Sequence, residues 1–158
     1  MPKLILTTAL ILALIASAQG GGVPKSMLGL VDGKPAAPSR GRANFYNCHG
    51  AYAGRISTNG RSTAEYNSQG SYAGRIDHSK NNATIYNGNG SYAGRADSSG
   101  NGTSFFDSKG SYSGRSSTSG NSTQFFDGHG SFSGRAVNSG GTTSFYDAAG
   151  RYVGRKGR

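Results

Sequence analysis

The chain has 158 residues, among them 27 glycines, seven acidic residues and no tryptophan, and its formal net charge is +10. This length allows one domain but not two once a signal segment is removed. The sixteen aromatic residues all lie between Phe45 and Tyr152, and the repeats contain no Leu, Met or Trp, so we do not expect a core of interdigitated aliphatic layers. The excess positive charge is typical of proteins that bind polyanions.

Residues 1–18 have the three parts of a secretory signal. Lys3 supplies the positive start, Leu4 to Ala16 the apolar stretch, and Ala16-Ser17-Ala18 the cleavage pattern of small residues. The apolar stretch is short for a membrane span, so we expect no transmembrane segment after cleavage. The protein is therefore predicted to be secreted, periplasmic or displayed at the cell surface.

Residues 19–43 are predicted to form a flexible linker. Three prolines, a Gly20-Gly21-Gly22 run and the basic Arg40-Gly41-Arg42 are typical of an exposed tether. Residues 44–158 then form the repeat domain, which ends in a basic tail containing Lys156 and Arg158.

Six copies of a twenty-residue repeat fill residues 45–155. The pattern is an aromatic, Asn or Asp, two free residues, Gly, one free residue, an aromatic, a small residue, Gly and Arg, as in FFDGHGSFSGR from Phe125 to Arg135. A period of this kind indicates stacked supersecondary units.

Two turns in each copy predict two strands in each copy. Asp127-Gly128-His129-Gly130 has the signature of a type I turn followed by a left-handed residue, which joins two strands of a hairpin. A second turn of the same kind is expected ten residues later, as at Ser117-Thr118-Ser119-Gly120. At the equivalent position Asp77-His78-Ser79-Lys80 lacks the glycine, so Lys80 must be left-handed or the turn must change type. The predicted fold is therefore all-β: an antiparallel β-hairpin repeat of about twelve short strands, arranged as a meander, roll or solenoid.

Three-residue loops at both turns would place Tyr66 opposite Tyr72, and Tyr72 opposite Tyr86. One face of the sheet would then carry a continuous row of aromatic rings, here called the aromatic ladder, with Gly54 and its equivalents beside it. We expect the ladder to be buried; a solvent-exposed ladder would be a ligand platform. Its members are Tyr46, Tyr52, Tyr66, Tyr72, Tyr86, Tyr92, Phe106, Tyr112, Phe126, Phe132, Tyr146 and Tyr152.

The opposite face is expected to hold Phe45 and its equivalents, together with one arginine from each copy. This regular row of guanidinium groups is a candidate binding site for an acidic ligand. A purely structural role explains the regularity equally well, because Arg135 could stack on Phe125 and Arg75 could pair with Glu65. The row consists of Arg55, Arg75, Arg95, Arg115, Arg135 and Arg155.

Other reactive side chains form no recurring constellation. Cys48, the single cysteine, is placed at a hairpin tip, where an intermolecular disulfide and an incidental free thiol are both open interpretations. The histidines His49, His78 and His129 fall in predicted turns and are expected to be solvated. Neither a Ser-His-Asp arrangement nor a metal-ligand spacing stands out, so we expect no catalysis, no cofactor and no metal.

The repeat resembles a known family. Tyr146-Asp147-Ala148-Ala149-Gly150-Arg151-Tyr152 is similar to the YD repeat of Rhs-type bacterial exported proteins and teneurins, in which the repeats form a continuous antiparallel strip that acts as a scaffold. Most copies depart from that pattern, with Phe-Phe-Asp or Tyr-Asn and with Ser after the glycine. A fainter similarity links the chain to the twenty-residue aromatic repeats of choline- and glucan-binding modules, which rely on tryptophan.

Two functions are compatible with the sequence. The first is a secreted, non-enzymatic repeat protein that binds an acidic polysaccharide or another polyanion through an arginine and aromatic surface. The alternative is a self-assembling structural protein, in which short similar strands continue from molecule to molecule as a fibre or other homo-oligomer.

Overall fold

The computed structural model describes residues 39–157, and these form twelve antiparallel strands without a helix. The predicted signal peptide and most of the predicted linker lie outside the described residues. No helix of residues 39–157 is long and apolar enough to cross a membrane. The strands are β1 (Ser39–Asn47), β2 (Tyr52–Gly60), β3 (Ser62–Asn67), β4 (Tyr72–His78), β5 (Asn82–Asn87), β6 (Tyr92–Ser99), β7 (Gly102–Asp107), β8 (Tyr112–Ser119), β9 (Ser122–Asp127), β10 (Phe132–Ser139), β11 (Thr142–Asp147) and β12 (Tyr152–Gly157).

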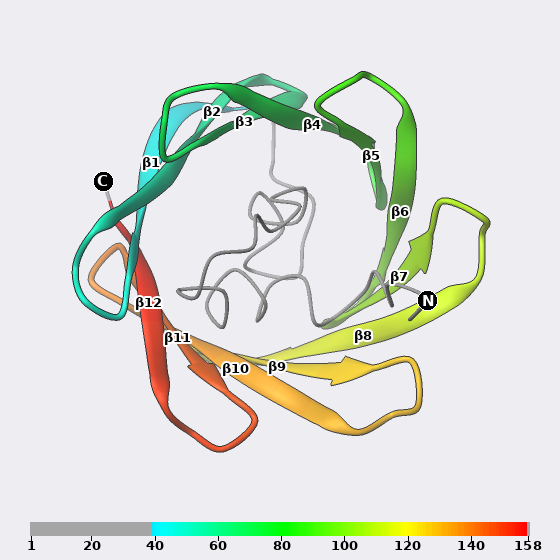
Figure 1. The fold of residues 1–158 in the computed structure, drawn as a ribbon. Coiled ribbons are helices and arrows are strands. Elements are labelled where there is room, and N and C mark those ends of the chain that lie inside the picture. Colours follow the sequence, from blue (N-terminus) through cyan, green and yellow to red (C-terminus); the bar gives the residue numbers. More distant parts are fainter. Residues whose placement is uncertain (1–38, 158) are drawn as a thin grey trace, which may run out of the picture.

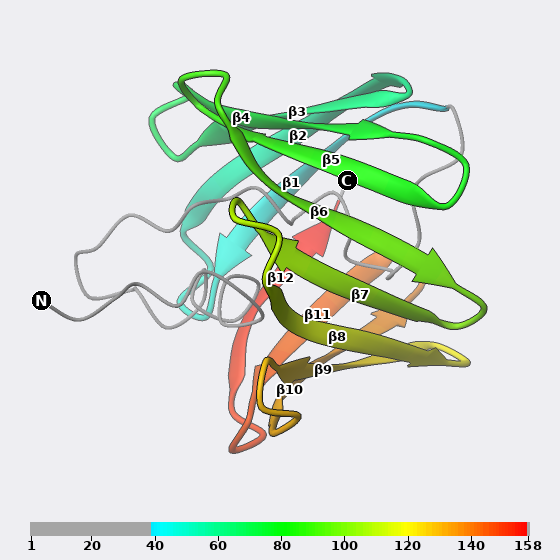
Figure 2. The same ribbon diagram turned by 90° about the vertical axis from the view of Figure 1, so that its right-hand side faces the viewer.

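The strands close into a barrel. Each strand pairs with its neighbours in the sequence, and β1 pairs with β12, so that the ends of the repeat domain meet at one seam (Figure 1). Figure 2 shows the strands running at a slant around the barrel axis, as closure of a twisted sheet requires. The predicted all-β, antiparallel fold of twelve strands is confirmed, but the sheet is a closed barrel rather than an open meander or solenoid.

The first turn of each copy is the predicted three-residue loop. In the β1–β2 loop, the amide of Gly50 donates to the carbonyl of Asn47, and Gly50 has a φ of 78°. The side-chain Oδ1 of Asn47 accepts hydrogen bonds from the amides of His49 and Ala51 at 3.0 and 2.9 Å. Asn or Asp at this position therefore fixes the loop, because its side chain accepts hydrogen bonds from backbone amides that have no partner in the neighbouring strand.

The second turn differs from the prediction. Ser119 pairs directly with Ser122, so only Gly120 and Asn121 form the turn, and Gly120 has a φ of 56°. Because the turn is shorter than predicted, the two strands pair in a register that differs by three residues from the predicted one, in which Tyr72 was opposite Tyr86. Tyr86 instead pairs with Arg75.

The turn that lacks a glycine changes its type. No non-glycine residue of the described chain has a positive φ, so Lys80 is not left-handed. The chain turns through Lys80 and Asn81, and the amide of Ser79 donates to the carbonyl of Asn82 at 2.7 Å. Of the two expectations for this turn, the change of type is the one that occurs.

A bulge in the second strand of each copy decides which side chains point inward. In β4, Tyr72 pairs with Tyr66 while Gly74 pairs with Glu65, so Ala73 is an extra residue without a partner of its own. An extra residue reverses the alternation beyond it. Arg75 consequently lies on the same outer face as Tyr72, and Gly74 faces inward. The prediction that the aromatic ladder and the arginines occupy opposite faces is wrong.

The glycine of this bulge is needed for both its backbone and its space. Gly94 has a φ of 150°, and a Cβ atom there would lie 2.4 Å from the carbonyl oxygen of Phe106. Its equivalents Gly74 and Gly154 are equally tight, at 2.5 Å from a carbonyl oxygen. The prediction that these glycines sit beside the aromatic ladder is also wrong, because they are buried on the inner face.

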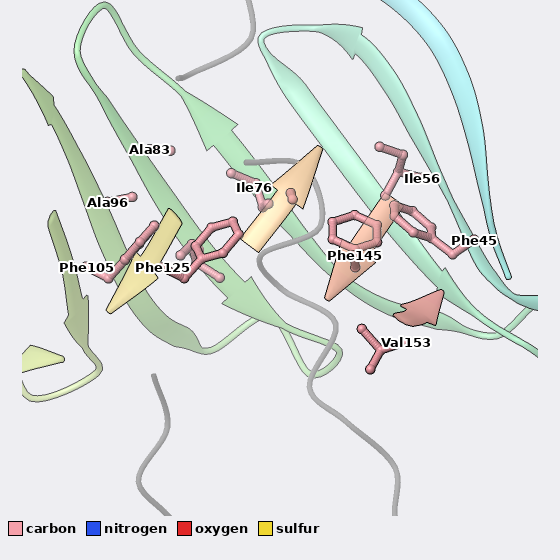
Figure 3. Packing of buried hydrophobic residues seen from close by; sticks show 11 residues of the cluster. Phe45, Ile56, Ile76, Ala83, Ala96, Phe105, Phe125, Phe145 and Val153 are labelled. Carbon is pink, nitrogen blue, oxygen red and sulfur yellow. The ribbon is translucent and has the colours of Figure 1, made fainter. Parts of the chain in front are cut away.

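The core lines the inside of the barrel (Figure 3). The first strand of each copy supplies one large inward residue, which pairs across the strand with the bulge glycine, as Phe125 does with Gly134. Burying such a side chain contributes about 1.5–3 kcal/mol. The buried hydrophobic residues are Phe45, Ile56, Ile76, Ala83, Ile85, Ala96, Phe105, Phe125, Ala136, Phe145 and Val153.

The seam repeats the geometry of the other boundaries between copies. Tyr46 of β1 pairs with Arg155 of β12, just as Tyr86 pairs with Arg75. β1 begins at Ser39, so the stretch Arg40-Gly41-Arg42 is paired with β2 and belongs to the sheet instead of the predicted linker. The six copies thus form a continuous ring in which the last copy meets the first in the same register.

Candidate functional site

The outer wall of the barrel carries both classes of predicted site residue. The bulge turns each row arginine outward, and the two-residue turn sets it opposite the first aromatic residue of the next copy. Arginine and aromatic side chains therefore alternate on one surface, which we call the outer belt. The belt consists of the six arginines Arg55, Arg75, Arg95, Arg115, Arg135 and Arg155 with the twelve residues of the aromatic ladder.

Every arginine of the belt stacks on an aromatic ring. The Arg55 Cζ atom lies 4.2 Å from the centre of the Tyr66 ring, and the equivalent distance from Arg75 to Tyr86 is also 4.2 Å. Such a contact at an exposed site is worth about 0.5–1 kcal/mol. The other pairs are Arg95 on Phe106 and Arg115 on Phe126, both at 4.3 Å, Arg135 on Tyr146 at 4.9 Å, and Arg155 on Tyr46 at 5.1 Å.

The second aromatic residue of each copy is exposed beside this stack. Tyr66 and Tyr72 meet edge to face with ring centres 6.2 Å apart, and four further pairs have centres 6.0–6.3 Å apart. The exposed fractions of the second residues are 40–46%. The ladder is therefore not the buried face, and it is interrupted by arginine after every second ring. The exposed residues are Tyr52, Tyr72, Tyr92, Tyr112, Phe132 and Tyr152.

The proposed structural partners of the arginines are also wrong. Phe125 and Glu65 point into the barrel, so Arg135 stacks on Tyr146 and Arg75 pairs with another carboxylate. Arg75 Nε donates to Asp77 Oδ2 at 3.0 Å, and this hydrogen bond raises the pKa of Arg75. Arg95 makes the same contact with Asp97.

The hairpin tips carry further polar contacts. Arg151 donates to Asp147 through its backbone amide and through Nε, and the backbone hydrogen bond is the main cause that lowers the pKa of Asp147. Cys48 is exposed at the tip of the β1–β2 loop, with its sulfur 3.4 Å from His49 Nδ1. Its role in an intermolecular disulfide stays a prediction.

His78 belongs to a polar cluster inside the barrel. The prediction that this histidine is solvated in a turn is wrong. His78 is 5% exposed, and its Nε2 lies 3.1 Å from Thr63 Oγ1, which in turn lies 3.1 Å from Thr58 Oγ1. Burial lowers the pKa of His78, and the carboxylate of Asp77 partly opposes this shift. The repeat could have predicted this burial. Position 78 is equivalent to Thr58 and Thr118, which point inward near the end of the second strand of their copies.

Metal-ligating side chains do not gather in the part of the chain that the structure describes: residues 39–157 hold no group of three or more His, Cys, Asp or Glu residues that could bind an ion. The candidate site is therefore a surface of guanidinium groups, phenol rings and phenyl rings. Its chemistry is that of binding by charge, hydrogen bonds and stacking.

Comparisons with known proteins identify no family. No known family model matches the chain, and no curated protein sequence is significantly similar to it. The resemblance to YD repeats and to choline- and glucan-binding repeats stays a prediction, and the function is argued from the belt alone.

Proposed function

We propose that this protein is a secreted, non-enzymatic binder of an acidic polymer, and that the outer belt is its binding surface. The observation that carries the proposal is the repeated stacking of a guanidinium group on an aromatic ring beside a second, exposed ring. Six such units surround the closed barrel, so a long ligand can contact several at once.

The stacking favours binding of carboxylate or sulfate groups. A guanidinium group that rests on a ring is held in place at its face, while the N–H groups along its edge remain able to donate to a bidentate acceptor. Holding the group in advance reduces the loss of side-chain entropy on binding. The belt is therefore better suited to anion recognition than an equal number of free surface lysines.

Closure of the sheet supports this proposal over the alternative of a fibre. Growth by strand addition needs an edge strand with unpaired backbone groups. Within residues 39–157 each of the twelve strands has a neighbour on both sides. The fibre would require opening of the β1–β12 seam, and electron microscopy at rising protein concentration tests for it.

The proposal is tested by retention on immobilised heparin under a salt gradient. The variant changes the belt residues Arg55, Arg135 and Arg155 together to Gln, and we expect it to elute at clearly lower salt with a weaker salt dependence of binding. The matched control changes three exposed turn cations, Arg61, Lys80 and Lys109, to Gln. Equal losses from the two variants would show that only net charge matters, and wild-type protein that is not retained at low salt would overturn the proposed function.

A further inference from the structure

The arginines of the belt differ in what stands two residues after them. Asp77 and Asp97 follow Arg75 and Arg95, and each aspartate accepts a hydrogen bond from its arginine at 3.0 Å. The other four arginines are followed at this position by Ser57, Ser117, Val137 and Gly157. The positive charges of Arg75 and Arg95 are therefore compensated by an aspartate. The other four arginines have no acidic residue at this position.

Further cations gather at the seam. Arg40 and Arg42 lie on β1 and are exposed, and Arg42 pairs in register with Ser57 of β2. On the two strands that flank β1, Arg155 pairs with Tyr46 and Arg55 pairs with Asn44. Three adjacent strands thus carry four outward arginines, which we call the seam patch: Arg40, Arg42, Arg55 and Arg155.

The two compensated arginines lie outside the seam patch, on β4 and β6, and we call β4–β7 the far side. In the ring of strands, β4 lies two strands from β2, and β6 and β7 are opposite β12 and β1, as Figure 1 shows. There the Arg95–Asp97 pair is joined by Asp107 at the end of β7, which pairs in register with Gly94. The residues that pair with Gly154 and Gly54, next to Arg155 and Arg55, are the uncharged Asn47 and Asn67, and Asp147 at the end of β11 is bonded to Arg151. The positive charge of the outer wall is therefore less compensated at the seam patch than beside Arg75 and Arg95.

We propose that the ligand is an acidic polysaccharide and that it binds at the seam patch. This inference rests on the proposed function. An uneven charge distribution concentrates a polyanion where the potential is highest, and does not distribute it around the whole belt. β1 and β12 come from opposite ends of the repeat domain, so Arg155 joins the other three arginines only when the barrel is closed. The complete seam patch therefore depends on closure.

The aromatic contacts favour a polysaccharide over a nucleic acid. Single-stranded nucleic acids bind with bases stacked on open ring faces. At the seam patch, Arg155 covers a face of Tyr46 and Tyr52 meets this ring edge to face with centres 6.3 Å apart. Tyr52 is 40% exposed and adds a hydroxyl group to the patch, which together with the guanidinium groups suits sugar hydroxyls and carboxylate or sulfate groups.

Matched pairs of substitutions separate the seam patch from net charge. The seam variant changes Arg55 and Arg155 to Gln, and the far-side variant changes Arg75 and Arg95 to Gln, so both lose two positive charges and two ring contacts. Binding of the full chain to heparin is measured at fixed ionic strength. We expect the seam variant to weaken binding about tenfold and the far-side variant less than about threefold.

A reciprocal exchange of side chains found in the protein's own repeats keeps the test informative if an arginine variant fails to fold. Ser57→Asp introduces beside Arg55 the aspartate that Arg75 and Arg95 have, and it should weaken heparin binding. Asp77→Ser with Asp97→Ser removes that compensation from the far side and should strengthen binding.

The outcomes distinguish the two proposals. Retention of wild-type protein with equal losses in the seam and far-side variants would overturn the seam patch while leaving the proposed function intact. No retention of wild-type protein would overturn the proposed function itself. Tighter binding of a DNA duplex or single strand than of heparin at the same ionic strength would overturn the assignment to a polysaccharide.

Discussion

Phe125 and Phe132 lie in the same copy of the repeat and face opposite sides of the barrel wall. Phe125 is 1% exposed in the core, whereas Phe132 is 41% exposed and meets Phe126 edge to face. We expect Phe125→Ala to lower the free energy of unfolding by about 3–5 kcal/mol, because it leaves a cavity. Phe132→Ala should cost only about 0.5–1.5 kcal/mol from the lost ring pair. Denaturant unfolding measures both, and a larger loss at Phe132 would mean that the assignment of the two faces is reversed.

His78 should make the stability of the barrel depend on pH. Its pKa in the folded protein is lowered by burial from the ordinary value of 6.5, although Asp77 acts in the opposite direction. Below about pH 6.5 the unfolded chain binds a proton at this histidine that the folded chain accepts only at lower pH. The free energy of unfolding should therefore fall as the pH is lowered from about 7 to about 5.

The matched control for this prediction comes from the repeat. His78→Thr introduces the residue found at the equivalent positions 58 and 118. Unfolding by denaturant at several pH values should show a smaller loss of stability on acidification for the variant than for wild type. The same slope in both proteins would contradict the assignment of the pH dependence to His78.

At the scale of single elements, the first turn was predictable and the second was not. Asn47 and Gly50 fix the first loop by local hydrogen bonds and a positive φ, and both signals are visible in the sequence. In the second turn the same kind of glycine is the first of two turn residues, as at Gly120, and not the last of a three-residue loop. Composition does not distinguish these two uses of glycine, and this ambiguity gave the wrong register.

The bulge caused the larger error. Ala73 and Gly74 are both small, so nothing in the sequence reveals that one of them has no partner of its own. An unseen extra residue moves every following side chain to the other face. For this reason the candidate residues were identified correctly as repeated features, while the arginines and the aromatic ladder were placed on different faces.

The first loop itself offers a test at this scale. Asp127 Oδ1 accepts hydrogen bonds from the amides of His129 and Ser131, each at 2.9 Å. Asp127→Ala should lower the free energy of unfolding by about 1–3 kcal/mol, because these contacts to a charged acceptor are lost. Asp127→Asn should change stability far less, since Asn87 makes the same two contacts in its own copy. Thermal unfolding compares the two variants, and an equal loss in both would show that the charge rather than the geometry holds the loop.

For the whole molecule, closure was the feature that local sequence could not predict. The turns and the alternation of inward and outward residues are the same in an open strip and in a ring. Closure depends on how far the register advances in each copy. Phe45 pairs with Gly54 and Gly54 pairs with Asn67, so one copy advances the register from position 45 to the equivalent of position 47. Repetition of this small advance six times gives the stagger that a closed barrel needs.

The equivalence of the seam to the other boundaries is tested by circular permutation. The permutant begins at Asn101, continues to Arg158, passes through an added Ser-Gly-Asn to Arg42, and ends at Gly100. The added residues copy the turn Ser119-Gly120-Asn121. Because β12 and β1 already pair in the register of a second turn, we expect the permutant to fold with a free energy of unfolding within about 1 kcal/mol of the linear chain 42–158.

A second variant of chain 42–158 shows what the seam contributes. Deletion of residues 148–158 removes β12, and it leaves β1 and β11 each with one unpaired edge. Such edges promote association between molecules, so this variant should lose cooperative unfolding or form oligomers detectable by light scattering. A permutant that fails to fold while chain 42–158 folds would show that the seam differs from the other boundaries. If the variant without β12 stays monomeric and cooperative, the barrel does not depend on closure between its first and last strands.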